Sequence, residues 1–85
     1  ITSPFYKAWA DQSMKDFKNL KQKLEHLDFN GMGEIVEANA LSLHAAIMTS
    51  RPAIIYSKPG TLDIIEKIRK ARNSGVDVYF TQDAG

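Results

Sequence analysis

The sequence predicts an α+β fold in which three helices pack on a small, mostly antiparallel sheet. Two observations lead to this prediction. Apolar residues recur at helical spacing over three stretches, at about 4–27, 29–49 and 62–73. After the third stretch, at about 76–82, apolar and polar residues alternate as in a half-buried strand. We expect this strand to pair with others that lie beyond the two ends of the chain.

The first predicted helix opens at Ser3 and Pro4. A serine at the N-cap accepts a hydrogen bond from a free amide, and a proline in the first turn has no amide to leave without a partner. The outer face carries lysines interleaved with carboxylates, which is typical of a solvated helix surface rather than a polyanion-binding patch. The apolar face consists of Phe5, Trp9, Phe17, Leu20, Leu24 and Leu27.

Asp28 is the predicted N-cap of the second helix. Gly31 and Gly33 follow in its first turns. Because glycine costs about 1 kcal/mol against alanine inside a helix, the two glycines indicate either tight packing or a frayed start. From Ala38 onward the helix is apolar on nearly every side, which predicts burial between two layers.

Three polar residues, Asn39, Ser42 and His44, interrupt this apolar stretch. Each needs a hydrogen-bond partner if it is buried, because an unsatisfied buried polar group costs about 1–3 kcal/mol. His44 is a candidate proton carrier or ligand, but no second histidine, cysteine or acidic residue lies one helical turn away. A hydrogen-bonded structural histidine is therefore the favoured interpretation.

A proline-bracketed segment, 51–60, follows the second helix and cannot be helical throughout. We predict an extended crossing segment, with a short strand bridge at Ile54 to Tyr56. Arg51 and Lys58 could meet phosphates there, although two cations in a loop are more often solvated. Thr61 is the predicted cap of the third helix, which turns Ile64, Ile65, Ile68 and Ala71 inward and stops at Gly75.

The predicted strand ends in a carboxylate. Val76, Val78 and Phe80 alternate onto one face, and Asp83 follows just past the strand, before Ala84 and Gly85. The two small residues would let a ligand approach the backbone closely. The alternative interpretation is a polar turn leaving the sheet, because aspartate and glycine are common turn residues.

Length and composition limit the possible classes of protein. A chain of 85 residues is one domain at most. It has no cysteine, and its net charge of +1 is far below that of most nucleic-acid binders, so we expect no nucleic-acid partner. No apolar run approaches the roughly 18–20 residues that span a bilayer, so we expect a cytoplasmic protein without a membrane partner. Because the sequence starts at Ile1, we also expect an excised piece of a longer protein.

Three sets of residues resemble one enzyme family. They are Ser3-Pro4-Phe5-Tyr6 with Trp9, Asn39-Ala40-Leu41 with His44-Ala45, and the closing run Tyr79-Phe80-Thr81-Gln82-Asp83-Ala84-Gly85. Together they resemble diphosphomevalonate decarboxylase, specifically its C-terminal domain. That family belongs to the superfamily of galactokinase, homoserine kinase, mevalonate kinase and phosphomevalonate kinase. The resemblance covers residues 1–85, and its most specific part is the Asp-Ala-Gly run, which places the family's catalytic aspartate at Asp83.

The resemblance implies a reaction of the mevalonate pathway of isoprenoid and lipid biosynthesis. A lyase of this family uses ATP and Mg²⁺ to convert mevalonate 5-diphosphate to isopentenyl diphosphate, ADP, phosphate and carbon dioxide. Asp83 would be catalytic, Ala84 would contribute a substrate-binding amide, and the other domain of a two-domain enzyme would hold most of the nucleotide and metal contacts. The family also implies a cytoplasmic homodimer. As half of an active site, the fragment alone is expected to be inactive.

Two alternatives remain open from the residues alone. The first is a related small-molecule kinase of the mevalonate pathway that phosphorylates without decarboxylating. The second is a helical interaction module without chemistry, in which Asp83 merely ends a strand.

Overall fold

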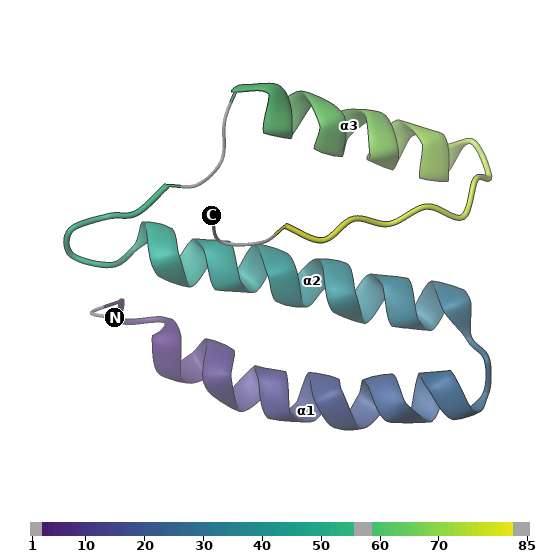
Figure 1. Cartoon of the computed structure of the whole chain (residues 1–85), viewed down its shortest axis with the longest axis horizontal. Helices are drawn as coiled ribbons and strands as arrows, with labels where there is room; N and C mark the ends of the chain where they lie inside the picture. The colour runs from purple at the N-terminus through teal and green to yellow at the C-terminus, as the bar shows by residue number, and fades with distance from the viewer. Residues whose placement is uncertain (1–2, 56–58, 83–85) are drawn as a thin grey trace.

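The computed structural model describes residues 3–55 and 59–82, which form three helices and one extended segment in a single layer (Figure 1). The helices are α1 (Tyr6–Glu25), α2 (Phe29–Met48) and α3 (Pro59–Asn73). The molecule measures 39 × 31 × 18 Å, so it is little thicker than one helix with its side chains. Both broad faces of the layer are therefore open.

A tight turn joins α1 and α2 into an antiparallel hairpin, and Asp28 caps α2 as predicted. Its carboxylate accepts a hydrogen bond from the Gly31 amide at 2.9 Å. The Lys23 ammonium lies 3.4 Å from the same carboxylate. The hydrogen bond from the Gly31 amide lowers the pKa of Asp28 below its usual value, and the nearby Lys23 ammonium lowers it further. The cap of α1 lies elsewhere than predicted, because this helix begins at Tyr6 and the Ser3 hydroxyl accepts from the Phe5 amide at 3.1 Å.

Helix α2 carries the buried residues of the described helices: Glu37, Ala40, His44, Ala46 and Ile47. It lies between α1 on one side and the extended segment on the other (Figure 1). The predicted burial of α2 between two layers is wrong for the described residues, since its flanks are covered while Leu41 and Met48 are 44% and 43% exposed on its open faces.

Helix α3 begins at Pro59, three residues earlier than predicted, with the proline in the first turn, where its missing amide costs nothing. None of its residues is buried, and Ile64, which was predicted to face inward, is 58% exposed. In Figure 1 the extended segment lies between α3 and α2, so α3 does not pack directly against α2 there. Before α3, Ile54 donates its amide to the Ile47 carbonyl at 3.3 Å, but no strand bridge forms at residues 54 and 55, and Tyr56 and Lys58 lie outside the described residues.

The predicted α+β class and the strand at 76–82 are wrong for the described chain. Residues 76–82 are extended, but within 3–55 and 59–82 they belong to no sheet. A strand needs the backbone of a neighbouring strand to receive its hydrogen bonds. Here side chains of α2 and α3 provide hydrogen bonds instead, at the Val78 carbonyl, the Phe80 amide and the Gln82 carbonyl. In the described residues, no helix is long and apolar enough to cross a membrane.

Candidate functional site

The predicted catalytic Asp83 and the predicted substrate-binding Ala84 both lie outside the described residues. The structure describes the segment that leads to them, residues 76–82. This segment runs along α2 in the same direction as the helix, because Tyr79 contacts Asn30, Phe80 contacts Glu37 and Gln82 contacts His44. Its attachment to α2 and α3 fixes where the chain arrives before Asp83.

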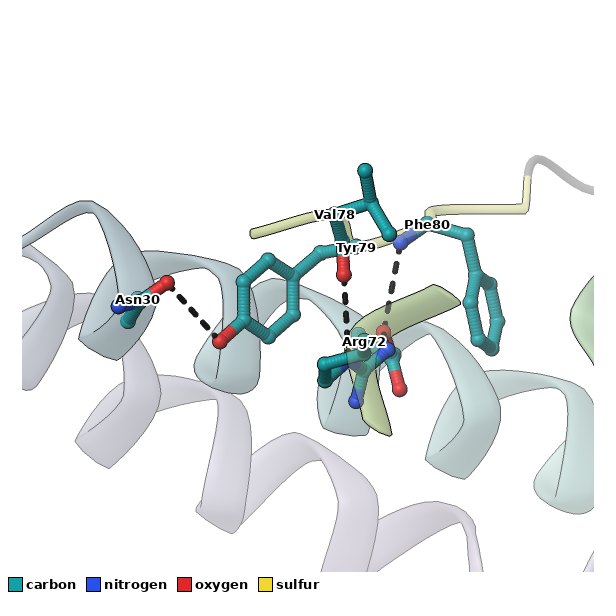
Figure 2. A network of polar contacts seen from close by, with 6 residues as sticks. Asn30, Arg72, Val78, Tyr79 and Phe80 are labelled. Atoms are coloured by element: carbon teal, nitrogen blue, oxygen red, sulfur yellow. Dashed lines mark hydrogen bonds and ion pairs between the residues drawn. The ribbon is translucent and has the colours of Figure 1, made fainter. Parts of the chain in front are cut away.

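An ion pair between Glu37 of α2 and Arg72 of α3 forms the first attachment (Figure 2). The Arg72 Nη2 lies 2.5 Å from the Glu37 Oε2. Both groups also bond the segment, since the Arg72 Nε donates to the Val78 carbonyl at 3.1 Å and the Phe80 amide donates to the Glu37 Oε2 at 3.4 Å. Only 12% of the Glu37 side chain is exposed, so these donors satisfy a largely buried carboxylate.

Tyr79 makes the second attachment. Its ring lies directly against the backbone of α2 at Gly33, where a β-carbon would overlap the ring. The ring meets Phe29 edge-on at 6.0 Å and lies 4.5 Å from the Arg72 guanidinium carbon. Burial raises the pKa of the Tyr79 phenol above its usual value, and the protonated phenol donates to the Asn30 Oδ1 at 3.2 Å. Of the two interpretations of Gly31 and Gly33, tight packing is therefore confirmed at Gly33.

His44 makes the third attachment, immediately before Asp83 in the chain. Its Nε2 lies 2.9 Å from the Gln82 carbonyl oxygen, and the residue is only 4% exposed. Because a carbonyl oxygen can only accept, this hydrogen bond requires the proton on Nε2. The prediction that His44 is a hydrogen-bonded structural histidine is confirmed.

A hollow of about 420 Å³ lies beside the end of the segment, between α1 and α2. One of its walls is polar, because the Asn39 amide donates to the Ser13 Oγ at 2.9 Å and to the Asp16 Oδ2 at 3.0 Å. Asn39 thus joins α1 to α2, whereas His44 faces the segment, so the predicted internal network is divided into two separate contacts. The residues that line the hollow include Trp9, Phe17, Val36, Asn39, Thr81 and Gln82.

Two features of the described residues bear on metal and phosphate binding. Within 3–55 and 59–82, no group of three or more histidine and acidic side chains could hold a metal ion. Gly31 and Gly33 belong to the first turns of α2, and Tyr79 covers the second of them, so they form no phosphate-binding loop.

The sequence analysis anticipated His44 but missed Glu37 and Arg72. Glu37 was not singled out because one carboxylate on a helix is usually solvated, and Arg72 because a basic residue in a last turn is a common helix end. The sequence did contain a weak indication that Glu37 has a partner. Glu37 follows Ile35 and Val36 and precedes the most apolar part of the helix, where a carboxylate requires a partner.

The chain is similar to known proteins over its whole length. Residues 1–85 match the family model described as the mevalonate 5-diphosphate decarboxylase C-terminal domain. Among curated proteins, the phosphomevalonate decarboxylase of Haloferax volcanii is 35% identical over 68 residues, which are 79% of this chain and 21% of that protein.

Solved structures agree with the family match. The mevalonate diphosphate decarboxylase from Enterococcus faecalis superposes with a TM-score of 0.95 at 39% identity, over 99% of this chain and 26% of that one. The mevalonate pyrophosphate decarboxylase from Streptococcus pyogenes gives a TM-score of 0.95 at 33% identity, over 99% and 27%. A further structure at 39% identity is of MDDEF in complex with MVAPP, AMPPCP and magnesium.

The fold and the matches define a class of domain, namely the C-terminal domains of mevalonate diphosphate decarboxylases. The chain belongs to the mevalonate 5-diphosphate decarboxylase C-terminal domain family. It spans about a quarter of the length of the solved relatives and 21% of the curated one.

Proposed function

We propose that this chain is the C-terminal domain of a two-domain, ATP-dependent decarboxylase that converts mevalonate 5-diphosphate to isopentenyl diphosphate, ADP, phosphate and carbon dioxide. The observation that carries the proposal is the family match over residues 1–85. Relatives whose structures hold MVAPP, AMPPCP and magnesium support the choice of substrate, nucleotide and metal. A small-molecule kinase and an interaction module without chemistry both receive less support than a decarboxylase.

Asp83 is the proposed catalytic residue. A carboxylate beside the tertiary hydroxyl of the substrate can orient that hydroxyl or take its proton as it attacks the γ-phosphoryl group of ATP. Its negative charge also stabilises the positive charge that develops at the tertiary carbon as phosphate leaves. Ala84, next in the chain, is proposed to offer its backbone amide to the substrate. ATP and Mg²⁺ are placed mainly on the other domain, as the family resemblance implies.

Product analysis of the whole enzyme tests the proposal. Incubation with mevalonate 5-diphosphate, ATP and Mg²⁺ should release carbon dioxide, ADP and phosphate in equal amounts. Formation of ADP with a phosphorylated product and no carbon dioxide would instead identify a kinase. The fragment of residues 1–85 alone should release none of these products.

A second candidate substrate is suggested by the curated relative, which is a phosphomevalonate decarboxylase. The same assay with mevalonate 5-phosphate in place of the diphosphate separates the two possibilities. We expect kcat/KM to be higher for the diphosphate, because the relatives that cover 99% of the chain are diphosphate decarboxylases.

The proposal includes a cytoplasmic homodimer, as the family resemblance implies. Light scattering of the purified enzyme measures its mass in solution. A mass of two chains is the expected result, and a mass of one chain would contradict this part of the proposal.

A further inference from the structure

Three contacts attach the extended segment to the helices, and they differ in their distance along the chain from Asp83. The Glu37–Arg72 pair bonds residues 78 and 80, and the Tyr79 ring lies on α2. The contact from His44 reaches Gln82, the residue directly before Asp83. Consecutive α-carbons are held about 3.8 Å apart. A shift of the Gln82 peptide therefore also shifts the point at which the chain enters residue 83.

His44 is well suited to hold that peptide. It lies in the most buried stretch of α2, between Ala40 at 7% exposure and Ala46 and Ile47 at 0% and 7%. Its ring is therefore held by packing on a rigid element, and its Nε2 points a single N–H group at the carbonyl, 2.9 Å away. Groups that position reacting atoms are most effective when they are placed on such elements.

We infer that His44 is a positioning residue for the decarboxylation, which it assists by fixing the Gln82 carbonyl, the last described peptide before Asp83 in the chain. The inference depends on the function proposed above. His44 touches no reacting atom in this account. Its effect is on geometry, and a displacement of about 1 Å at a reacting group is able to lower a rate on the order of a hundredfold. Because most of the substrate and nucleotide contacts are placed on the other domain, the loss should fall on kcat rather than on KM.

The test compares two substitutions at His44 in the whole enzyme. His44→Phe keeps a planar ring but removes the N–H donor, and we expect kcat to fall on the order of 10- to 100-fold. KM for mevalonate 5-diphosphate and for ATP should change by less than about twofold. His44→Gln retains an N–H group at a similar reach, and its kcat should recover to within about threefold of the wild type.

A control separates positioning from a general loss of stability. Ile47, one turn further along α2, is also buried, at 7% exposure, and its apolar side chain can make no hydrogen bond to the Gln82 carbonyl. Ile47→Val is therefore the control. It should unfold at a lower denaturant concentration than the wild type but keep kcat within about twofold. If His44→Phe fails to fold, His44→Met offers a flexible apolar side chain for the same comparison with His44→Gln.

The outcomes distinguish the inference from the function on which it depends. A wild-type enzyme that releases no carbon dioxide overturns the proposed function and the positioning role of His44 together. An active wild type with equal kcat in His44→Phe overturns the inference alone. So does a His44→Gln variant that is as slow as His44→Phe, because the donor would then have no role.

Discussion

At the residue scale, Gly33 decides how closely the extended segment approaches α2. The ring of Tyr79 occupies the space that a β-carbon at position 33 would take. Glycine is needed here for this close approach and in spite of its unfavourable effect on the helix. The same contact brings the ring within reach of Phe29 and Arg72, so the missing β-carbon permits two neighbouring interactions.

Gly33→Ala should therefore destabilise the protein, by about 1–2 kcal/mol, because the overlap with the Tyr79 ring exceeds the gain in helix propensity. Urea unfolding measures the change. Gly60→Ala is the matched control, since within the described residues a β-carbon there would meet no heavy atom within 4 Å outside the chain neighbours and the backbone of its own helix. It should be neutral or stabilise by up to about 1 kcal/mol. Equal stability of the two variants would contradict the packing described for Gly33.

At the element scale, Arg72 joins α3 to the rest of the molecule. Helix α3 has no buried residue, and its last turn reaches Glu37 and the Val78 carbonyl through one guanidinium group. A largely buried carboxylate that loses the cation paired with it retains the cost of desolvation, so the pair should be strongly coupled.

A double-mutant cycle tests this coupling. Glu37→Gln, Arg72→Met and their combination should give an interaction free energy of about 1–3 kcal/mol in urea unfolding. The corresponding cycle on Asp63 and Lys67, whose side chains are 62% and 73% exposed, should give less than about 0.5 kcal/mol. Coupling of the first pair no larger than that of the second would mean that α3 is held by other contacts.

Asp28, the cap of α2, gives the protein a pH dependence of known sign. Its pKa is lower in the folded state than the ordinary value of 3.8, so the unfolded chain binds the proton more tightly. The stability from this group is therefore present above pH 3.8 and is lost as the pH falls through the lower, folded-state pKa. Asp28→Asn keeps a cap without the charge, so its stability should change less between pH 6 and pH 3 than that of the wild type. Thermal melts of both proteins at the two pH values measure this change in stability. An equal change in the wild type and in Asp28→Asn would show that the Asp28 charge does not contribute to the pH dependence.

Sequence reasoning located the helices because their signals are local. The cap at Asp28 and the apolar spacing are properties of neighbouring residues, and both agree with the structure. The prediction of a strand at 76–82 was wrong because strand formation is not local. Alternation shows which faces of a segment are apolar, but it does not show whether another backbone lies alongside to pair with it. Glu37 and Arg72 are 35 residues apart, and only the return of the chain along α2 brings them together. Gln82, the partner of His44, could not be predicted for the same reason, because the two residues are far apart in the sequence.

At the scale of the whole molecule, the described chain is an open layer rather than a closed core. Its radius of gyration is 14.1 Å, whereas a compact chain of this length has about 12 Å. The apolar stripe of α1 shows the consequence, since Phe17 and Leu24 are 61% and 58% exposed although their spacing predicts burial. The fixed feature of this layer is the path of its last residues along α2, which brings the chain to Asp83 by three side-chain attachments.

The most direct test of this account is the turnover number of the whole enzyme carrying Asp83→Asn, with Asp77→Asn as the control. Each substitution removes one negative charge, and Asp77, in the segment that precedes Asp83, is exposed. We expect Asp83→Asn to lower kcat by about a thousandfold or more with little change in KM, and Asp77→Asn to leave both unchanged. A kcat for Asp83→Asn within tenfold of the wild type would contradict the catalytic role of this carboxylate.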